Sequence, residues 1–247
     1  MFLRLYTELA PWWPLLSPPD AYVDDAMAVH ALIQQVLRRE PRTLLELGCG
    51  SGTLASHLPP SVQVELNDLS PEMIAVATTR NPGAITHCAD LRTLRLPRTF
   101  DAVLIHDATM YLDQRADVEA ALETAHAHLE PGGVLVLMPD FVEETFYPGT
   151  DAGGGDDASG RAVRLLEWRW DRDPEDGHFE VEMALLLRDT DGTVHSVHEQ
   201  HAMSLYSLSQ WWQMLAAAGF TVVPVDPTTL PFEREVGEVI VAVRNED

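Results

Sequence analysis

The amino-acid sequence predicts an α/β protein with a doubly wound seven-stranded sheet, an inserted antiparallel β meander and an N-terminal helical lid. Strand-like and helical patterns alternate over residues 43–138, which is typical of a mostly parallel sheet. Three glycines at alternate positions follow the first strand-like run. After residue 160 the pattern changes to three consecutive strand-like runs with no helix between them, and this change predicts the meander.

The strands and helices of the sheet can be placed one by one. Apolar runs predict strands at 43–48, 62–68, 84–88, 100–106 and 134–138. Helical spacing predicts helices that begin near Gly52, cover 70–80 with Ser70 as N-cap and Pro71 in the first turn, and cover 113–129 before Pro131 and two glycines.

The later part of the chain has a different organisation. A Gly/Asp-rich stretch at 151–160 predicts a mobile loop, the first site of limited proteolysis. Strand-like runs follow at 162–170, 178–189 and 193–207, then a helix at 207–219 capped by Ser207 or Ser209, and strands at 220–225 and 235–244. These patterns divide the chain into a lid segment (1–40), a core (41–140), a substrate-side cap (141–206) and a C-terminal return to the core sheet (207–247).

Composition narrows the classes of function. The chain has 247 residues and a formal net charge of −23, which repels phosphate backbones and anionic lipid surfaces, so we expect neither nucleic acid nor membrane as a partner. Cys49 and Cys88 are far apart and in no metal-ligand spacing; we expect no metal and a reducing, cytoplasmic setting. Arg4 and Glu8 interrupt the first apolar run, which argues against a signal peptide. The partner we expect is a small-molecule substrate, with the chain as a monomer or a homodimer.

The glycine loop carries the clearest chemical signal. Gly48, Gly50 and Gly52 follow a strand, so the backbone can turn tightly and lie close to a ligand without Cβ clashes. Asp68 ends the next strand about 20 residues later, where a carboxylate binds both ribose hydroxyls. Dinucleotide dehydrogenases share these features, but their third glycine stands one residue later, where this chain has Thr53. Glu46 before the loop suits an ammonium group better than a diphosphate.

Together these motifs resemble the S-adenosylmethionine (SAM) site of class I methyltransferases, a Rossmann-like fold. The resemblance covers residues 42–139 and includes Glu46-x-Gly-x-Gly-x-Gly52, Asp68-Leu-Ser-Pro-Glu-Met73, Asp90-Leu91, Phe100-Asp-Ala-Val103 and Leu129-Glu-Pro-Gly-Gly133. It implies Glu46 and Gly48 near the methionine part of SAM, Asp68 on the ribose, Leu69 and Met73 beside the adenine, and Asp90 on the adenine amino group. The full set of cofactor-binding residues that we expect is Tyr22, Glu46, Gly48, Cys49, Gly50, Asp68, Leu69, Met73, Asp90, Leu91 and His106.

The substrate is expected over the end of the strand at 100–106, because ligands of open α/β sheets lie at the carboxyl ends of the strands. His106 and Asp107 stand there, and either can be structural or catalytic. Residues 6–13 with Tyr22, and His201-x-x-x-Leu205-Tyr206 with Trp211, resemble glycine/sarcosine and amino-sugar N-methyltransferases, in which these segments roof the active site. We therefore expect Asp107, His201 and His106 as catalytic residues, and Tyr6, Trp13, Tyr111, Trp168 and Tyr206 as substrate contacts.

The sequence thus predicts a SAM-dependent methyltransferase that acts on a nitrogen or oxygen of a small molecule. An oxidoreductase that uses NAD is one alternative, disfavoured by the glycine spacing and by Glu46. A non-catalytic SAM-binding module is the other.

Overall fold

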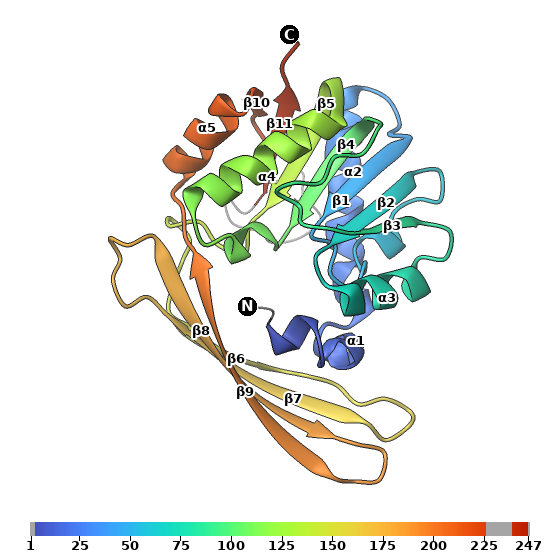
Figure 1. Cartoon of the computed structure of the whole chain (residues 1–247), viewed down its shortest axis with the longest axis vertical. Helices are drawn as coiled ribbons and strands as arrows, with labels where there is room; N and C mark the ends of the chain where they lie inside the picture. Colours follow the sequence, from blue (N-terminus) through green and yellow to red (C-terminus); the bar gives the residue numbers. More distant parts are fainter. Residues whose placement is uncertain (1–2, 226–238, 247) are drawn as a thin grey trace.

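The computed structural model of the protein describes residues 3–225 and 239–246. It contains two sheets, with the N-terminal segment between them (Figure 1). The larger sheet has the strand order β10-β11-β5-β4-β1-β2-β3, and the smaller has the order β6-β7-β8-β9. Among the described residues, no helix is long and apolar enough to cross a membrane.

The larger sheet confirms the predicted doubly wound core. Its strands are β1 (Thr43–Leu47), β2 (Gln63–Asp68), β3 (Ile85–Cys88), β4 (Phe100–His106), β5 (Leu129–Met138), β10 (Phe220–Val223) and β11 (Ile240–Arg244). The first five strands pair in parallel, and β11 pairs antiparallel with both β5 and β10. The carboxyl ends of β1, β4 and β5 therefore meet at one edge of the sheet.

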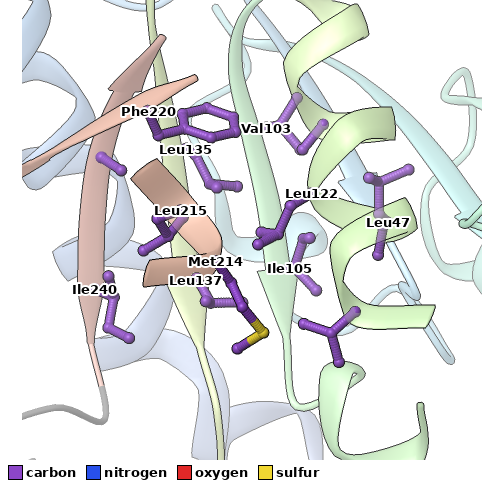
Figure 2. Packing of buried hydrophobic residues seen from close by; sticks show 14 of the residues in the cluster. Leu47, Val103, Ile105, Leu122, Leu135, Leu137, Met214, Leu215, Phe220 and Ile240 are labelled. Carbon is purple, nitrogen blue, oxygen red and sulfur yellow. The ribbon is translucent and has the colours of Figure 1, made fainter. Parts of the chain in front are cut away.

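Helices cover both faces of this sheet. α4 (Arg115–His128) and α5 (Leu208–Ala217) pack on one face, where Leu122, Met214 and Leu215 meet the strand residues Ile105 and Leu137 (Figure 2). α2 (Val23–Leu37) packs on the opposite face, and α3 (Pro71–Arg80) lies against β2 and β3. The predicted caps are present, because the Ser70 and Ser207 hydroxyls accept from the backbone N–H groups three residues later.

The smaller sheet is the predicted meander with one more strand. Its strands are β6 (Gly149–Gly153), β7 (Ala162–Trp170), β8 (His178–Arg188) and β9 (Val194–Ser204), all paired antiparallel. Alternate residues of β8 are buried and exposed along its length, as a sheet with one covered face requires. The covered face packs on the N-terminal segment.

The N-terminal segment reaches the meander in short helical turns. These are η1 (Arg4–Tyr6), η2 (Ala10–Trp12), α1 (Trp13–Leu16) and η3 (Pro19–Tyr22), and they lead into α2. Leu5 and Leu9 are buried in the apolar cluster under the meander. α2 instead belongs to the layer that covers the core sheet, so the expected lid of residues 1–40 is confined to the turns before α2.

Two local predictions were wrong. The helix expected near Gly52 is only the turn η4 (Ala55–His57), because Pro59 and Pro60 follow within a few residues and proline cannot continue a helix. Residues 151–153 of the expected loop belong to β6, which pairs with β7. η5 (Thr109–Tyr111) follows β4 and was not predicted. Part of the predicted strand at 235–244 lies outside the described residues.

Met214 tests the packing between α5 and the core sheet. The substitution Met214→Ala removes a fully buried side chain, and we expect a loss of about 2–5 kcal/mol in the free energy of unfolding. Gln213→Ala changes an exposed position of the same helix and should cost less than about 0.5 kcal/mol. Urea denaturation followed by circular dichroism measures both values, and equal losses would contradict this packing.

Candidate active site

A cavity of about 420 Å³ lies between the core sheet, the N-terminal segment and the meander. Its volume is typical of small-molecule sites. The core contributes residues at the ends of β1, β4 and β5, and the other walls come from the N-terminal turns and the covered face of the meander. Its lining includes Tyr6, Trp13, Tyr22, Glu46, Gly48, Cys49, Gly50, His106, Asp107, Tyr111, Asp140, Phe141, Glu167 and Arg169.

The glycine loop forms the floor of the cavity, and its glycines serve different purposes. Gly48 has φ +75°, and a Cβ there would lie 2.4 Å from the Cβ of Ala108, so the loop touches the turn after β4 only because residue 48 has no side chain. Gly50 has φ +51° and open space beside it, and it lines the cavity. A left-handed backbone with an open face lets a ligand approach the main chain.

Asp68 holds the glycine loop in place. Its Oδ2 accepts from the backbone N–H of Gly50 at 2.8 Å, and its Oδ1 accepts from that of Ser70 at 2.8 Å. Burial raises the pKa of this carboxyl group, against the hydrogen bonds that lower it. Each oxygen keeps a further lone pair for a ligand. The expected contact with a ribose stays a prediction, to which the structure adds a role in loop geometry.

Glu46 is the most unusual group of the cavity. The residue is 2% exposed, and its Oε2 has no hydrogen-bond partner among the described residues. Burial raises its pKa to about 7, although the charge of His106 acts in the opposite direction. A buried carboxylate without a partner is costly, which indicates that a cationic or hydrogen-bond-donating ligand group completes this site.

The end of β4 places two predicted residues in the cavity wall. His106 Nε2 lies 3.4 Å from Asp107 Oδ2 and 3.6 Å from Asp25 Oδ2, and its ring meets the ring of Tyr22 edge to face at 5.7 Å. Asp107 has φ +51°, a conformation that costs about 1–3 kcal/mol and that concentrates at functional sites. The sharp turn at this residue ends β4 where the cavity begins.

Three charged lining residues escaped the sequence analysis. Asp140 stands two residues after β5. Ligands lie at the carboxyl ends of strands, so Asp140 could have been predicted on the same grounds as Asp107. Glu167 and Arg169 come from the covered face of β7, and Arg169 forms ion pairs with both Glu167 and Asp151. Nothing in the sequence showed which face of β7 is covered.

Tyr6 of η1 and Tyr111 of η5 meet in the lining of the cavity. Their hydroxyl groups share a hydrogen bond of 2.6 Å, and burial raises the pKa of both, so the two phenols stay protonated at neutral pH. His201 does not reach the cavity. It is 1% exposed and lies behind Tyr111, with Nδ1 at 3.5 Å from the Tyr111 hydroxyl. The expectation that His201 contacts the acceptor is therefore corrected.

Other predicted residues also lie outside the cavity lining. Trp168 is 54% exposed and stacks with Trp170 on the outer face of β7, because its neighbours Glu167 and Arg169 occupy the inner face. Tyr206 packs against Trp211 in the core. Asp90 accepts hydrogen bonds from the Arg92 guanidinium with both of its oxygens. The remaining four are placed as follows: Asp68 holds the glycine loop, Leu69 is exposed, Met73 of α3 is buried, and Leu91 packs against the core.

Comparisons with known proteins agree on one family. The sequence model of a methyltransferase domain matches residues 21–225. A dTDP-3-amino-3,6-dideoxy-α-D-glucopyranose N,N-dimethyltransferase of Streptomyces fradiae is 34% identical over 205 residues, which cover 81% of this chain and 78% of that protein.

Solved structures extend the similarity to the whole fold. The SAM-bound amino pentose methyltransferase of calicheamicin biosynthesis from Micromonospora echinaspora is 28% identical, with a TM-score of 0.73 over 99% of this chain and 98% of that one. A sugar N-methyltransferase from Streptoalloteichus is 26% identical, with a TM-score of 0.78 over 91% of this chain and 88% of that one.

Gly48→Ala tests the contact between the glycine loop and the turn after β4. Gly83 also has a positive φ but open space around it, so Gly83→Ala carries only the conformational cost of about 1–2 kcal/mol. Gly48→Ala adds overpacking against Ala108, worth about 1–3 kcal/mol more. Thermal unfolding of the two variants measures the difference. An equal loss of stability in both would show that the contact between residue 48 and Ala108 is loosely packed.

Proposed function

The chain belongs to the methyltransferase domain family, whose model matches residues 21–225. From this membership and the geometry of the cavity we infer what the chain methylates. It is an enzyme that uses SAM to methylate a nitrogen of a small molecule. The alternative of an NAD-dependent oxidoreductase is thereby set aside. The proposed acceptor is the amino group of a sugar carried on a nucleoside diphosphate, the class that the relative from Streptomyces fradiae acts on by its name. The carboxylates at the ends of β4 and β5 carry this proposal.

The chemistry of the cavity fits SAM at the glycine-loop side. Glu46 Oε2 is buried without a hydrogen-bond partner among the described residues, and the ammonium of a bound methionine group would supply one. Gly48 and Gly50 would lie along the methionine part, Tyr22 would lie beside it from the N-terminal segment, and Asp68 would take the ribose hydroxyls. When bound, SAM supplies an electrophilic methyl group on a positively charged sulfur.

The acceptor would lie between the end of β4 and the meander. Asp107 and Asp140 line the cavity at the edge where the methyl group would be presented, and the aromatic rings of Tyr6, Trp13 and Phe141 close the other sides. Carboxylates beside aromatic faces favour a cationic group over an anionic one. A protonated amine is such a group.

Asp107 has the chemistry to prepare the amine. An amine is nucleophilic only after it loses the proton that occupies its lone pair, and a positioned carboxylate can accept that proton. His106 lies 3.4 Å from Asp107 Oδ2 and is placed to share the charge. A fixed orientation of the acceptor would contribute as well, because positioning accounts for a large part of the rate of such a transfer.

The pH dependence of SAM binding tests the role of Glu46. With a free pKa of about 7 and a lower pKa once it pairs with an ammonium, Glu46 releases a proton on binding, so affinity falls as the pH falls. We expect about fivefold weaker binding at pH 6 than at pH 7. In Glu46→Gln, binding is weaker and nearly independent of pH in this range.

Isothermal titration calorimetry measures these affinities. Glu123→Gln removes an exposed carboxylate on α4 and should keep the wild-type pH dependence. A wild-type affinity that does not change between pH 6 and pH 7 would remove Glu46 from the ammonium site.

A panel of acceptors tests the proposed substrate. The wild-type protein with SAM should methylate dTDP-3-amino-3,6-dideoxyglucose, and should leave the same nucleotide sugar with a hydroxyl in place of the amine unchanged, as mass spectrometry would show. Asp107→Asn keeps a residue type that tolerates the left-handed backbone but cannot take a proton. Its turnover should fall about 10²-fold or more, with SAM affinity nearly unchanged. Methylation of the hydroxyl sugar alone would overturn the amine assignment.

A further inference from the structure

A row of polar side chains leads from the cavity wall into the meander. The Tyr6 and Tyr111 hydroxyls line the cavity and lie 2.6 Å apart. Tyr111 Oη is 3.5 Å from His201 Nδ1, and His201 Nε2 is 3.3 Å from Glu199 Oε2. His201 and Glu199 are 1% and 7% exposed, so the row ends inside the protein.

The hydrogen-bond partners of Glu199 set the direction of this row. Its Oε1 accepts from the backbone N–H of Arg4 at 2.7 Å, and its Oε2 accepts from that of Leu5 at 2.9 Å. A carboxylate that already serves as an acceptor requires a donor from His201, which places the ring proton on Nε2. In a neutral imidazole Nδ1 is then an acceptor.

The direction continues through the two tyrosines. Tyr111 donates its hydroxyl proton to His201 Nδ1, and Tyr6 donates its proton to Tyr111. Burial raises the pKa of both phenols. Nearby carboxylates raise it further, those of Asp140, Asp107 and Asp68 at Tyr6 and those of Asp140 and Glu167 at Tyr111, so these protons stay in place. Both tyrosine oxygens are left with free lone pairs, and Tyr6 Oη has no proton to offer the cavity.

We propose that the buried Glu199–His201 pair is a positioning unit that makes the Tyr6 and Tyr111 hydroxyls hydrogen-bond acceptors toward the cavity, and so orients an amine. This inference rests on the proposed amine acceptor. An amine has N–H bonds on one side and its lone pair on the other. Acceptors that hold the N–H bonds turn the lone pair away from the tyrosines.

The same carboxylate links this orientation to the position of the N-terminal segment. Glu199 belongs to β9 of the meander, and the N–H groups that it accepts begin η1, the turn that carries Tyr6. In Figure 1 these first residues lie between the core and the meander. One side chain therefore places Tyr6 over the cavity and, through His201, fixes the direction of its hydrogen bond.

The protonation of His201 tests the inference without a substrate. Nitrogen NMR of the protein labelled with ¹⁵N-histidine reports which ring nitrogen carries a proton, and the signals of His201 are those missing from the spectrum of His201→Phe. We expect a neutral ring protonated on Nε2 at pH 7.5 in the wild type, and a changed pattern in Glu199→Gln. A ring protonated on Nδ1, or on both nitrogens, would overturn the inference, because Tyr111 would then accept rather than donate.

Kinetics with the amino sugar of the acceptor panel test the consequence. His201→Phe removes the acceptor for Tyr111, and we expect kcat to fall by about 10–100-fold with unchanged SAM affinity. His201→Asn offers an amide oxygen where Nδ1 stood and should restore part of kcat. His198→Phe changes an exposed histidine of the same strand, paired with Glu182 on the outer face, and should keep wild-type kcat.

The outcomes separate this inference from the proposed function. Wild-type kcat in His201→Phe, or equal losses in His201→Phe and His201→Asn, would overturn the positioning unit while leaving the methyl transfer intact. A wild-type protein that does not methylate the amino sugar would overturn the proposed acceptor, and the NMR result would still decide the direction of the row. If His201→Phe fails to fold, Tyr6→Phe removes the last hydroxyl of the row and should lower kcat to a similar extent.

Discussion

The contact between the glycine loop and the turn after β4 is the constraint on which the rest of the site depends. β1 and β4 are neighbours at the point where the strand order reverses, and a side chain at Gly48 would hold the two loops apart. Their contact opens a crevice at the carboxyl edge of the sheet, the place where open α/β sheets bind ligands. Asp107 owes its position in that crevice to the sharp turn beside Ala108, with its left-handed backbone.

The N-terminal turns that form one wall of the cavity are not stable on their own. Three-residue helical turns such as η1 do not persist in isolation, because one or two hydrogen bonds cannot offset the entropy of ordering the chain. Burial of Leu5 and Leu9 under the meander and the two hydrogen bonds to Glu199 hold the segment in place. The inserted meander is therefore what allows the first residues of the chain to serve as a wall of the cavity.

The charges of the cavity agree with a cationic ligand and acceptor. Carboxylates come from three different strand ends, as Glu46, Asp107 and Asp140, whereas the cation of the lining, Arg169, is already paired with Asp151 and Glu167. SAM carries an ammonium and a sulfonium, and a protonated amine adds a third positive group. Surface acids explain much of the net charge of −23, but only the buried ones affect recognition, since water and salt screen the others.

The sequence by itself determined most of the strands and helices of the core, the glycine loop and the family, because these depend on local periodicity and on short motifs. It did not determine which side chains meet. A strand with period 2 has two faces, and only packing decided that Glu167 and Arg169 of β7 face the cavity while Trp168 faces solvent. His201 was expected to contact the acceptor, but Tyr111 lies between it and the cavity, a placement that depends on residues remote in the chain. The contact of Glu199 with the first turn of the chain became visible only in the tertiary structure, since contacts between remote residues leave no pattern in a single sequence.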